Sequence, residues 1–378
     1  MIASRVFENL SATASSDEIE RLLSQHTFPL VEGSTVTFVF FGEAESVSLR
    51  HWIYGLPGSL PLTRLGKSDL WYHSVEFPTG SRIEYKLGVT RNGNEEWIFD
   101  PLNCQVAHDP FGGNSVVHGS DYIAPEWSNE ISESQQGRLD TFSIQSQALG
   151  GERISRVYVP ANFRPYRRYR LLVVHDGNDY VNFSRLNHVL DNLIARNEIS
   201  PLIVALSNPH DRLREYANDR RHAQHVVEEL IPELESHYPL ITTSSGRCIM
   251  GASFGGVAAL STAWHYPDAF DSMLVQSGSF AFTDIGQHSR SPVFDPVVEF
   301  MNQFRKHPGK PVKKAYVSCG VYESLIYENR SLVPFLNSIG IKTKFEEAFD
   351  GHNWENWRDR LRTGLSWLFP GPLWETYL

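Results

Sequence analysis

The stretch from residue 247 to residue 260 constrains the fold of this chain more than any other. It reads RCIMGASFGGVAAL, which predicts a short apolar strand, a tight glycine turn and a helix of small residues. Ser253 stands at the turn. A Cβ at Gly251 or Gly255 would collide across the turn, so both positions need glycine. The helix that follows directs the partial positive charge of its amino terminus at the serine.

This stretch contains a Gly-x-Ser-x-Gly pattern, which is typical of a nucleophile elbow. The pattern alone is weak, because glycine and serine are common in ordinary loops. The strand before it and the helix after it supply the context that an elbow requires. We therefore predict that Ser253 is a catalytic nucleophile and that the N–H of Phe254 is one of two oxyanion donors.

Composition bounds the class of protein. The 378 residues carry a net charge of −10 with a pI near 5.8, and they predict two or three domains with a sizeable core. The acidic balance argues against binding to nucleic acid or to a membrane surface. Three scattered cysteines indicate neither disulfides nor a metal site, and His210 and Asp211 are isolated, so no metal or cofactor is expected. Without a recognisable signal peptide or membrane span, we expect a cytoplasmic protein.

The chain divides by pattern into four parts. Residues 1–28 predict a helical lead-in. Residues 29–117 hold short alternating strands with regular turns, which are typical of a β-sandwich. Residues 118–137 are polar and turn-rich and predict a linker. Residues 138–378 predict a second domain.

In the second domain, strands alternate with helices, which predicts an α/β fold with a mostly parallel sheet. The first two strands predict a hairpin. Besides the strand of the elbow, strands are expected at 141–145, 156–159, 169–174, 201–206, 272–276, 314–319 and 342–346, and helices at 186–196, 224–238 and 354–368. This is the element order of an α/β-hydrolase domain.

In that order, a catalytic triad runs serine, acid, histidine along the chain. Glu323 follows the strand at 314–319, and His352 lies between the last strand and the final helix. His352 would take the Ser253 proton and Glu323 would orient the imidazole. A serine hydroxyl needs such a base because it is a poor nucleophile at neutral pH.

Other carboxylates compete with Glu323 for the role of the acid. Asp350 is the main rival, although its place two residues before the histidine favours a loop-capping role. Asp284 and Asp295 follow the strand at 272–276 and remain candidates for the acid. The second oxyanion donor is expected in the loop after the strand at 169–174, within residues 176–178. A side chain cannot identify a backbone donor, and we choose the N–H of Asn178.

Three motifs together resemble the esterase D group of α/β-hydrolases. They are GASFGG around Ser253, HDGN at 175–178 and GHNW at 351–354. Within the group, the chain is similar to the enterochelin (ferric enterobactin) esterases over most of residues 31–371. The resemblance implies a β-sandwich before the hydrolase domain, ester hydrolysis without a cofactor, Glu323 as acid and the amide of Asn178 as second oxyanion donor.

The first domain resembles the early-set immunoglobulin-like domains that precede some esterases and glycan-acting enzymes. The resemblance rests on LW at 70–71, PTG at 78–80, EYK at 84–86, DPLN at 100–103 and FGGNS at 111–115. In carbohydrate-binding members, exposed tryptophans stack on sugars. Trp52, Trp71 and Trp97 are candidates, but we favour a core position because tryptophan is usually well buried.

Two features bear on the substrate, which we expect to be a small-molecule ester. Arg212, Arg214, Arg220 and Arg221 form a basic cluster that would attract an anionic ferric catecholate. The alternative is that Arg214 pairs with Glu215 and the other arginines are solvated. The aromatic side chains of a pocket for an aryl group would be those of Phe254, Tyr322 and Trp354.

The residues therefore favour a serine esterase acting on a catecholate siderophore, with Arg212, Arg214, Tyr322 and Trp354 binding it. Feruloyl or acetyl esters of glycans are alternative substrates. Acyl transfer to an acceptor other than water shares the same acyl-enzyme. A non-catalytic binding protein on a hydrolase scaffold is disfavoured by the intact set of triad residues.

Overall fold

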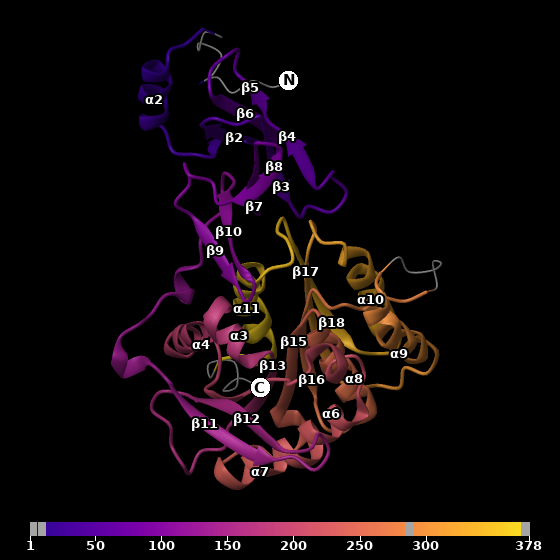
Figure 1. Cartoon of the computed structure of the whole chain (residues 1–378). Helices are drawn as coiled ribbons and strands as arrows, with labels where there is room; N and C mark the ends of the chain where they lie inside the picture. Colours follow the sequence, from indigo (N-terminus) through magenta and orange to yellow (C-terminus); the bar gives the residue numbers. More distant parts are fainter. Residues whose placement is uncertain (1–5, 7–12, 284–289, 372–378) are drawn as a thin grey trace. The chain divides into compact units, whose positions relative to one another are not determined.

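The computed structural model describes residue 6 and residues 13–283 and 290–371, and its backbone divides into two compact units (Figure 1). Unit 1 comprises Met1–Ala124 with two short segments, Gly320–Glu323 and Ala348–Asn353, and unit 2 comprises the remainder. The change from unit 1 to unit 2 after Ala124 falls within the stretch expected to be a linker.

Unit 1 is built on two antiparallel sheets. Their strand orders are β1-β2-β6-β5 and β4-β3-β7-β10-β9, with β8 also paired to β7. The strands are β1 (Leu30–Glu32), β2 (Thr35–Phe41), β3 (Ser46–His51), β4 (Ser59–Pro61), β5 (Thr63–Arg64), β6 (Leu70–Glu76), β7 (Arg82–Arg91), β8 (Asn94–Ile98), β9 (Val106–Asp109) and β10 (Gly112–His118). Side chains of both sheets share one core, in which Phe38 packs edge-on against Tyr85. The unit is therefore a β-sandwich, as the alternating pattern predicted.

A helix of the predicted lead-in packs on this sandwich. Helix α2 (Ser16–Ser24) begins with a capping box between Ser15 and Glu18, which satisfies amides that the first turn leaves without partners. Its apolar side chains Ile19 and Leu23 are buried against the sandwich. Residues 1–5 and 7–12 of the lead-in lie outside the described residues.

The three tryptophans of unit 1 differ in exposure. Trp71 is buried in the sandwich core, as expected. The expectation is wrong for Trp52 and Trp97, whose side chains are 54% and 51% exposed. Trp97 lies on the solvent face of β8, where the guanidinium of Arg50 packs 5.2 Å from the ring centroid.

Unit 2 contains an eight-stranded sheet with the order β11-β12-β14-β13-β15-β16-β17-β18. Its strands are β11 (Arg138–Gln145), β12 (Glu152–Val159), β13 (Arg170–His175), β14 (Leu202–Ser207), β15 (Arg247–Ala252), β16 (Ser272–Gln276), β17 (Lys314–Gly320) and β18 (Lys342–Ala348). β11 and β12 form the predicted antiparallel hairpin, and β14, β13, β15, β16 and β17 are parallel. The predicted α/β architecture is therefore present.

Helices cover both faces of this sheet (Figure 1). In unit 2, the described helices of six or more residues are α3 (Gly177–Ser184), α4 (Leu186–Ala195), the π-helix His225–Leu230, α7 (Ile231–His237), α8 (Phe254–His265), α9 (Asp295–Lys306), α10 (Ile326–Ser338) and α11 (Trp354–Leu368). Alternate residues of β13 divide between two cores. Leu171 and Val173 pack with α8 and α9, whereas Leu172 and Val174 pack with α4 and α11. A strand buried on both faces explains its continuous apolar run.

The segments Gly320–Glu323 and Ala348–Asn353 belong to unit 1. A buried arginine of the sandwich forms an ion pair with the second of these segments. The Arg82 side chain has no exposed surface, and its guanidinium contacts the carboxylates of Glu84 at 2.9 Å and Asp350 at 3.3 Å. Such a buried charge needs its partners, because desolvation is otherwise uncompensated. The expected continuous second domain is therefore interrupted at these two segments.

Removal of the Arg82 charge is expected to destabilise the protein strongly. Arg82→Ala would leave the buried carboxylate of Asp350 without its cation, and we expect the free energy of unfolding to fall by about 3 kcal/mol or more. Arg64→Ala is the matched control, because the Arg64–Asp69 pair is exposed and should contribute less than about 1 kcal/mol. Urea denaturation followed by tryptophan fluorescence measures both. Equal losses would contradict the assignment.

Candidate active site

Ser253 lies on a sharp turn between β15 and α8. Its backbone has a φ of 56° and a ψ of −122°, which is a strained conformation for a residue with a side chain. A Cβ on Gly251 would lie 2.2 Å from the carbonyl oxygen of Gly255, so the predicted collision is confirmed there. A Cβ on Gly255 would lie 3.2 Å from the nearest atom, which is tight without a collision. The turn is therefore an elbow that only these small residues permit.

Hydrogen bonds from the next strand hold the elbow. The N–H of Ser253 donates to the carbonyl of Gln276 at 3.0 Å, and the N–H of Ser279 donates to the carbonyl of Ser253 at 3.1 Å. The hydroxyls of Ser253 and Ser279 lie 3.2 Å apart. The contact of Ser279 with the elbow was not predicted from the sequence. Its place three residues after the end of β16, at the carboxyl edge of the sheet, was the available signal.

The loop after β13 carries the other predicted oxyanion donor. Asp176 has a left-handed backbone with a φ of 55°, and α3 starts at Gly177. A Cβ on Gly177 would meet the backbone of Leu206 at 2.4 Å, so the loop lies directly on β14. The N–H of Asn178 donates to Oδ1 of Asn208 at 2.9 Å. Asn208 directly follows the end of β14, a position that borders the site, but this contact was not predicted from the sequence.

Arg212 forms an ion pair within unit 2. Its Nε and Nη2 contact the carboxylate of Asp176 at 2.8 to 3.0 Å, and its guanidinium packs over the ring of Tyr216. The hydroxyl of Tyr216 also accepts the N–H of Asp176. A forked pair of this kind fixes the loop. The expectation that Arg212 offers its charge to a substrate must be corrected, because Asp176 already neutralises that charge.

The other arginines of the predicted cluster differ among themselves. Arg221 pairs with Asp219 at 2.6 Å. Arg214 and Arg220 are exposed, and among the described residues their guanidinium groups have no carboxylate partner. The expected alternative pairing of Arg214 with Glu215 is absent, because the buried carboxylate of Glu215 binds Arg153 at 2.9 Å.

The predicted base and acid, both in unit 1, form a hydrogen-bonded pair. Nδ1 of His352 lies 2.7 Å from Oε2 of Glu323, and the N–H of Gly320 donates to Oε1 of Glu323 at 2.8 Å. Glu323 is buried, whereas the His352 side chain is 38% exposed. A buried carboxylate on Nδ1 fixes the orientation of the imidazole.

The rival carboxylates have other surroundings. Asp350 accepts hydrogen bonds from the N–H of Gly351 and the amide of Asn353 and contacts Arg82. This is the loop-capping role that its position favoured. Asp295 starts helix α9, and Asp284 lies outside the described residues.

Of the predicted aromatic pocket residues, two are core residues of unit 2. Trp354 is buried edge-on against Tyr180, and Phe254 is buried against Phe294. The expectation that Trp354 binds substrate must therefore be corrected. In unit 1, Tyr322 is half-buried, and its hydroxyl lies 2.7 Å from that of Ser81.

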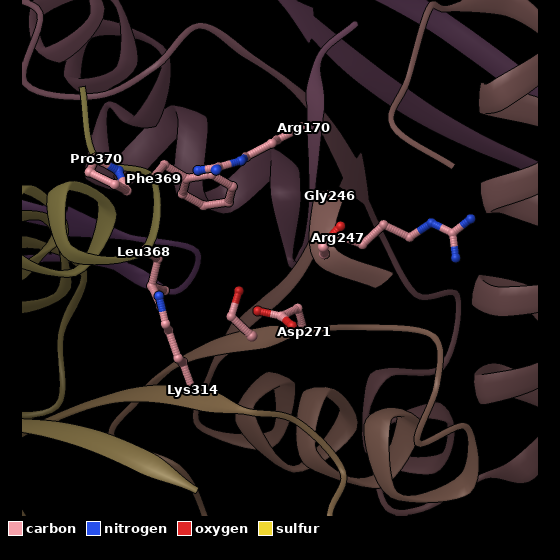
Figure 2. A pocket seen from close by; sticks show the side chains of 10 residues that line it. Arg170, Gly246, Arg247, Asp271, Lys314, Leu368, Phe369 and Pro370 are labelled. Atoms are coloured by element: carbon pink, nitrogen blue, oxygen red, sulfur yellow. The ribbon is translucent and has the colours of Figure 1, made fainter. Parts of the chain in front are cut away.

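A cavity of about 150 Å³ lies where the parallel strands begin (Figure 2). Ser253 follows the other end of β15. Arg170, Arg247 and Lys314, the first residues of β13, β15 and β17, line the cavity with Asp271. Asp271 forms an ion pair with the ammonium group of Lys313 at 2.7 Å.

A group of buried histidines lies beneath the loop after β13. The rings of His175 and His222 are 5.0 Å apart, and each is about 5 Å from the ring of Tyr216. Burial, followed by the nearby charge of Arg212, lowers the pKa of His175 to about 3. Burial also holds the pKa of His222 well below its ordinary value. Both rings are therefore neutral at pH 7.

Two kinds of feature are absent from the described residues. Outside residues 1–5, 7–12, 284–289 and 372–378, no helix is long and apolar enough to cross a bilayer. The same part of the chain holds no group of three or more histidine, cysteine or acidic side chains placed to bind a metal ion.

The fold and the elbow together define the class of protein. A mostly parallel sheet with helices on both faces, and a serine at the sharp turn after a central strand, are the features of an α/β-hydrolase. The family model described as "Putative esterase" matches residues 146–368, which is more than half of the chain. The chain therefore belongs to this esterase family, whose activity is the hydrolysis of carboxylic esters.

Known proteins agree with this assignment. The chain is 28% identical over 151 residues to the uncharacterised protein YjcH of Bacillus subtilis, a match that spans 38% of this chain and 62% of that protein. It is 24% identical to an iron(III) enterobactin esterase of Dickeya dadantii over 82% of this chain and 79% of that protein. The structure of the enterobactin esterase FES from Shigella flexneri aligns with a TM-score of 0.72 at 19% identity, over 91% of this chain and 94% of that one. The expected resemblance to the enterochelin esterases is thus confirmed.

The neutral histidines predict a pH-dependent stability. Because the folded state holds the pKa of His175 near 3, only the unfolded chain binds this proton as the pH falls below about 6.5. Stability should therefore fall on acidification, by about 2 kcal/mol from this histidine between pH 7 and pH 5. His175→Phe should reduce that loss, whereas a change at the exposed His210 should not. Urea denaturation at both pH values measures the loss, and an unchanged pH dependence in His175→Phe would contradict the prediction.

Proposed function

We propose that this chain is a serine esterase that cleaves the ester bonds of a catecholate siderophore through an acyl-enzyme on Ser253. The strained backbone of Ser253 carries the catalytic part of this proposal, because such a conformation at a strand end is typical of a nucleophile. The Glu323–His352 hydrogen bond supports it. The two residues follow β17 and β18, which succeed β15 and β16 in the sheet.

The proposed reaction has two halves. His352 takes the proton of the Ser253 hydroxyl as Oγ attacks the ester carbonyl, and the same proton then passes to the departing alcohol as the carbon–oxygen bond breaks. Water attacks the acyl-enzyme in the second half, again with His352 as base, and releases the acid. Glu323 accepts the Nδ1 hydrogen and stabilises the imidazolium that forms in each half. The N–H groups of Phe254 and Asn178 bind the oxyanion.

The substrate is proposed from relatives and from charge. The Dickeya dadantii relative is named for iron(III) enterobactin, and we extend that substrate class to this chain. A ferric catecholate is an anion, so it would be attracted by exposed arginines whose charge is unmatched. Arg214 and Arg220 meet that condition better than Arg212, which is bound to Asp176. Attraction of this kind weakens with salt over a Debye length of about 8 Å at physiological ionic strength.

We also infer that the sandwich of unit 1 is of the early-set immunoglobulin-like type. Its exposed Trp52 and Trp97 are the positions at which a sugar would stack if the substrate were instead a feruloyl or acetyl ester of a glycan. This substrate class, and acyl transfer to an acceptor other than water, are the outcomes against which the siderophore proposal is tested.

A substrate panel tests the proposal. The enzyme is incubated with ferric and iron-free triscatecholate, methyl ferulate and acetylated xylan, and products are identified by mass spectrometry. We expect cleavage of the triscatecholate ester, with a kcat/KM for the ferric complex that falls with added salt more steeply than that for a neutral aryl ester. Ser253→Ala should abolish turnover and labelling by a fluorophosphonate.

Each part of the proposal has its own contrary result. Cleavage of only ferulate or acetyl esters would replace the siderophore and leave the nucleophile intact. A new ester formed when a sugar acceptor is added would indicate transfer. Labelling that persists in Ser253→Ala would exclude Ser253 as the nucleophile.

The two loop carboxylates should differ in their effect on catalysis. Glu323→Gln removes the charge on Nδ1 of His352, and we expect kcat to fall by about 100-fold or more. Asp350→Asn is the matched control, because this carboxylate contacts Arg82 and should affect stability more than kcat. Steady-state hydrolysis of p-nitrophenyl butyrate and urea denaturation measure the two effects. A larger loss of kcat in Asp350→Asn would identify Asp350 as the acid.

A further inference from the structure

We propose that Asn208 is a positioning residue that holds the oxyanion amide of Asn178 in the ligand-free protein and must release it during catalysis. This inference rests on the proposed function, in which the N–H of Asn178 stabilises the tetrahedral intermediate. It concerns contacts within unit 2 alone.

The contact follows from the register of two parallel strands. His175 of β13 pairs with Ser207 of β14, so the residues that follow them leave the sheet side by side. The N–H of Asn178 donates to Oδ1 of Asn208 at 2.9 Å, and Nδ2 of Asn208 donates to the carbonyl of Leu206 at 3.2 Å. The oxygen and the nitrogen of the Asn208 carboxamide are therefore both hydrogen-bonded. The oxygen accepts the same N–H that would stabilise the oxyanion.

The backbone of the loop has little freedom to turn that amide elsewhere. The Asp176 carboxylate is held by the fork of Arg212, and its N–H is held by the hydroxyl of Tyr216. Gly177 lies so close to Leu206 that even a Cβ would not fit. The Asn208 side chain, which is half-buried, is consequently the part of this contact that can move.

Asn178 itself carries a second group that the Asn208 carboxamide could bind. Oδ1 of Asn178 is buried and accepts no hydrogen bond from any described residue. A buried acceptor without a donor is unfavourable. The amide hydrogens of Asn208 can satisfy it once Oδ1 of Asn208 has left the N–H of Asn178.

Replacement of Asn208 Oδ1 by the substrate oxygen, as the acceptor of the Asn178 N–H, is more favourable in the transition state than with the bound ester. The bond between Asn178 N–H and Asn208 Oδ1 joins two neutral groups, and a neutral ester carbonyl has no advantage over it. A hydrogen bond to an oxyanion is roughly twice as strong, so the developing charge can take the amide from Asn208. An interaction gained only in the transition state raises kcat and leaves KM nearly unchanged. The hydrogen bond to Asn208 lowers kcat, because it must break before the Asn178 N–H can bind the oxyanion.

Substitutions of Asn208 should therefore change kcat in opposite directions. Asn208→Ala removes the competing acceptor, and we expect kcat for p-nitrophenyl butyrate to rise by about 3- to 10-fold with little change in KM. Asn208→Asp places a carboxylate on the same amide, and we expect kcat to fall by about 10-fold or more. The ratio of Asn208→Asp to wild-type activity should recover as the pH is lowered and the new carboxyl is protonated. A purely structural role would lower kcat in both variants.

Controls separate this inference from the function on which it rests. Asn337→Ala removes an exposed asparagine whose Oδ1 accepts a hydrogen bond from the Thr343 hydroxyl, and it should leave kcat unchanged. Asn178→Pro removes the N–H in the first turn of α3, where proline is tolerated, and should lower kcat by about 100-fold. Circular dichroism and thermal melting check the fold of each variant, and Asn208→Ser replaces Asn208→Ala if the alanine variant does not fold.

Three results would overturn the inference, and each has a different meaning. A lower kcat in Asn208→Ala, or equal effects of alanine and aspartate, would show that Asn208 does not compete for the amide. Full activity of Asn178→Pro would show that this amide is not an oxyanion donor, although Ser253 would still be the nucleophile. Full activity of Ser253→Ala would instead refute the proposed function itself.

Discussion

The close approach of two backbone segments at Ser253 is the constraint on which the candidate site depends. The carbonyl of Gly255 lies where a Cβ of Gly251 would be, and the serine between them has a positive φ. Such strain persists only where the surroundings hold it. Hydrogen bonds to Gln276 and from Ser279 supply that support, so the strand β16 beside the elbow is part of its stability. The result is a serine held at the amino end of α8, where the helix favours negative charge.

Charge compensation extends this arrangement to the loop after β13. Asp176 lies against the first turn of α8, and its carboxylate would oppose an oxyanion if it were unpaired. The fork of Arg212 neutralises it and fixes the loop at the same time. Beneath the loop, His175 stays neutral because burial and the Arg212 charge both disfavour its protonation. A fixed backbone is what the proposed oxyanion site requires, because its donors must be preorganised.

Sequence periodicity predicted most elements, because burial on one or both faces determines the residue pattern of each strand and helix. The final helix at 354–368 and the elbow were located correctly. Pairing of side chains was not predictable in this way. Arg212 and Asp176 are far apart in sequence, and only the fold brings them together. Trp354 faces the core because of its position on α11, which composition does not reveal, and the role of Asn208 depends on the register of β13 and β14.

The pairing of arginines limits how an acidic chain can attract an anion. Because the net charge is −10, attraction of the proposed ferric catecholate would have to come from a local group of cations. Ion pairs with Asp176 and Asp219 remove Arg212 and Arg221 from that group. A field from Arg214 and Arg220 alone decays within about one Debye length, which is about 8 Å at physiological salt. For the proposed anionic substrate, charge would therefore act only close to the protein surface, and shape and acyl chemistry would contribute the larger part of selectivity.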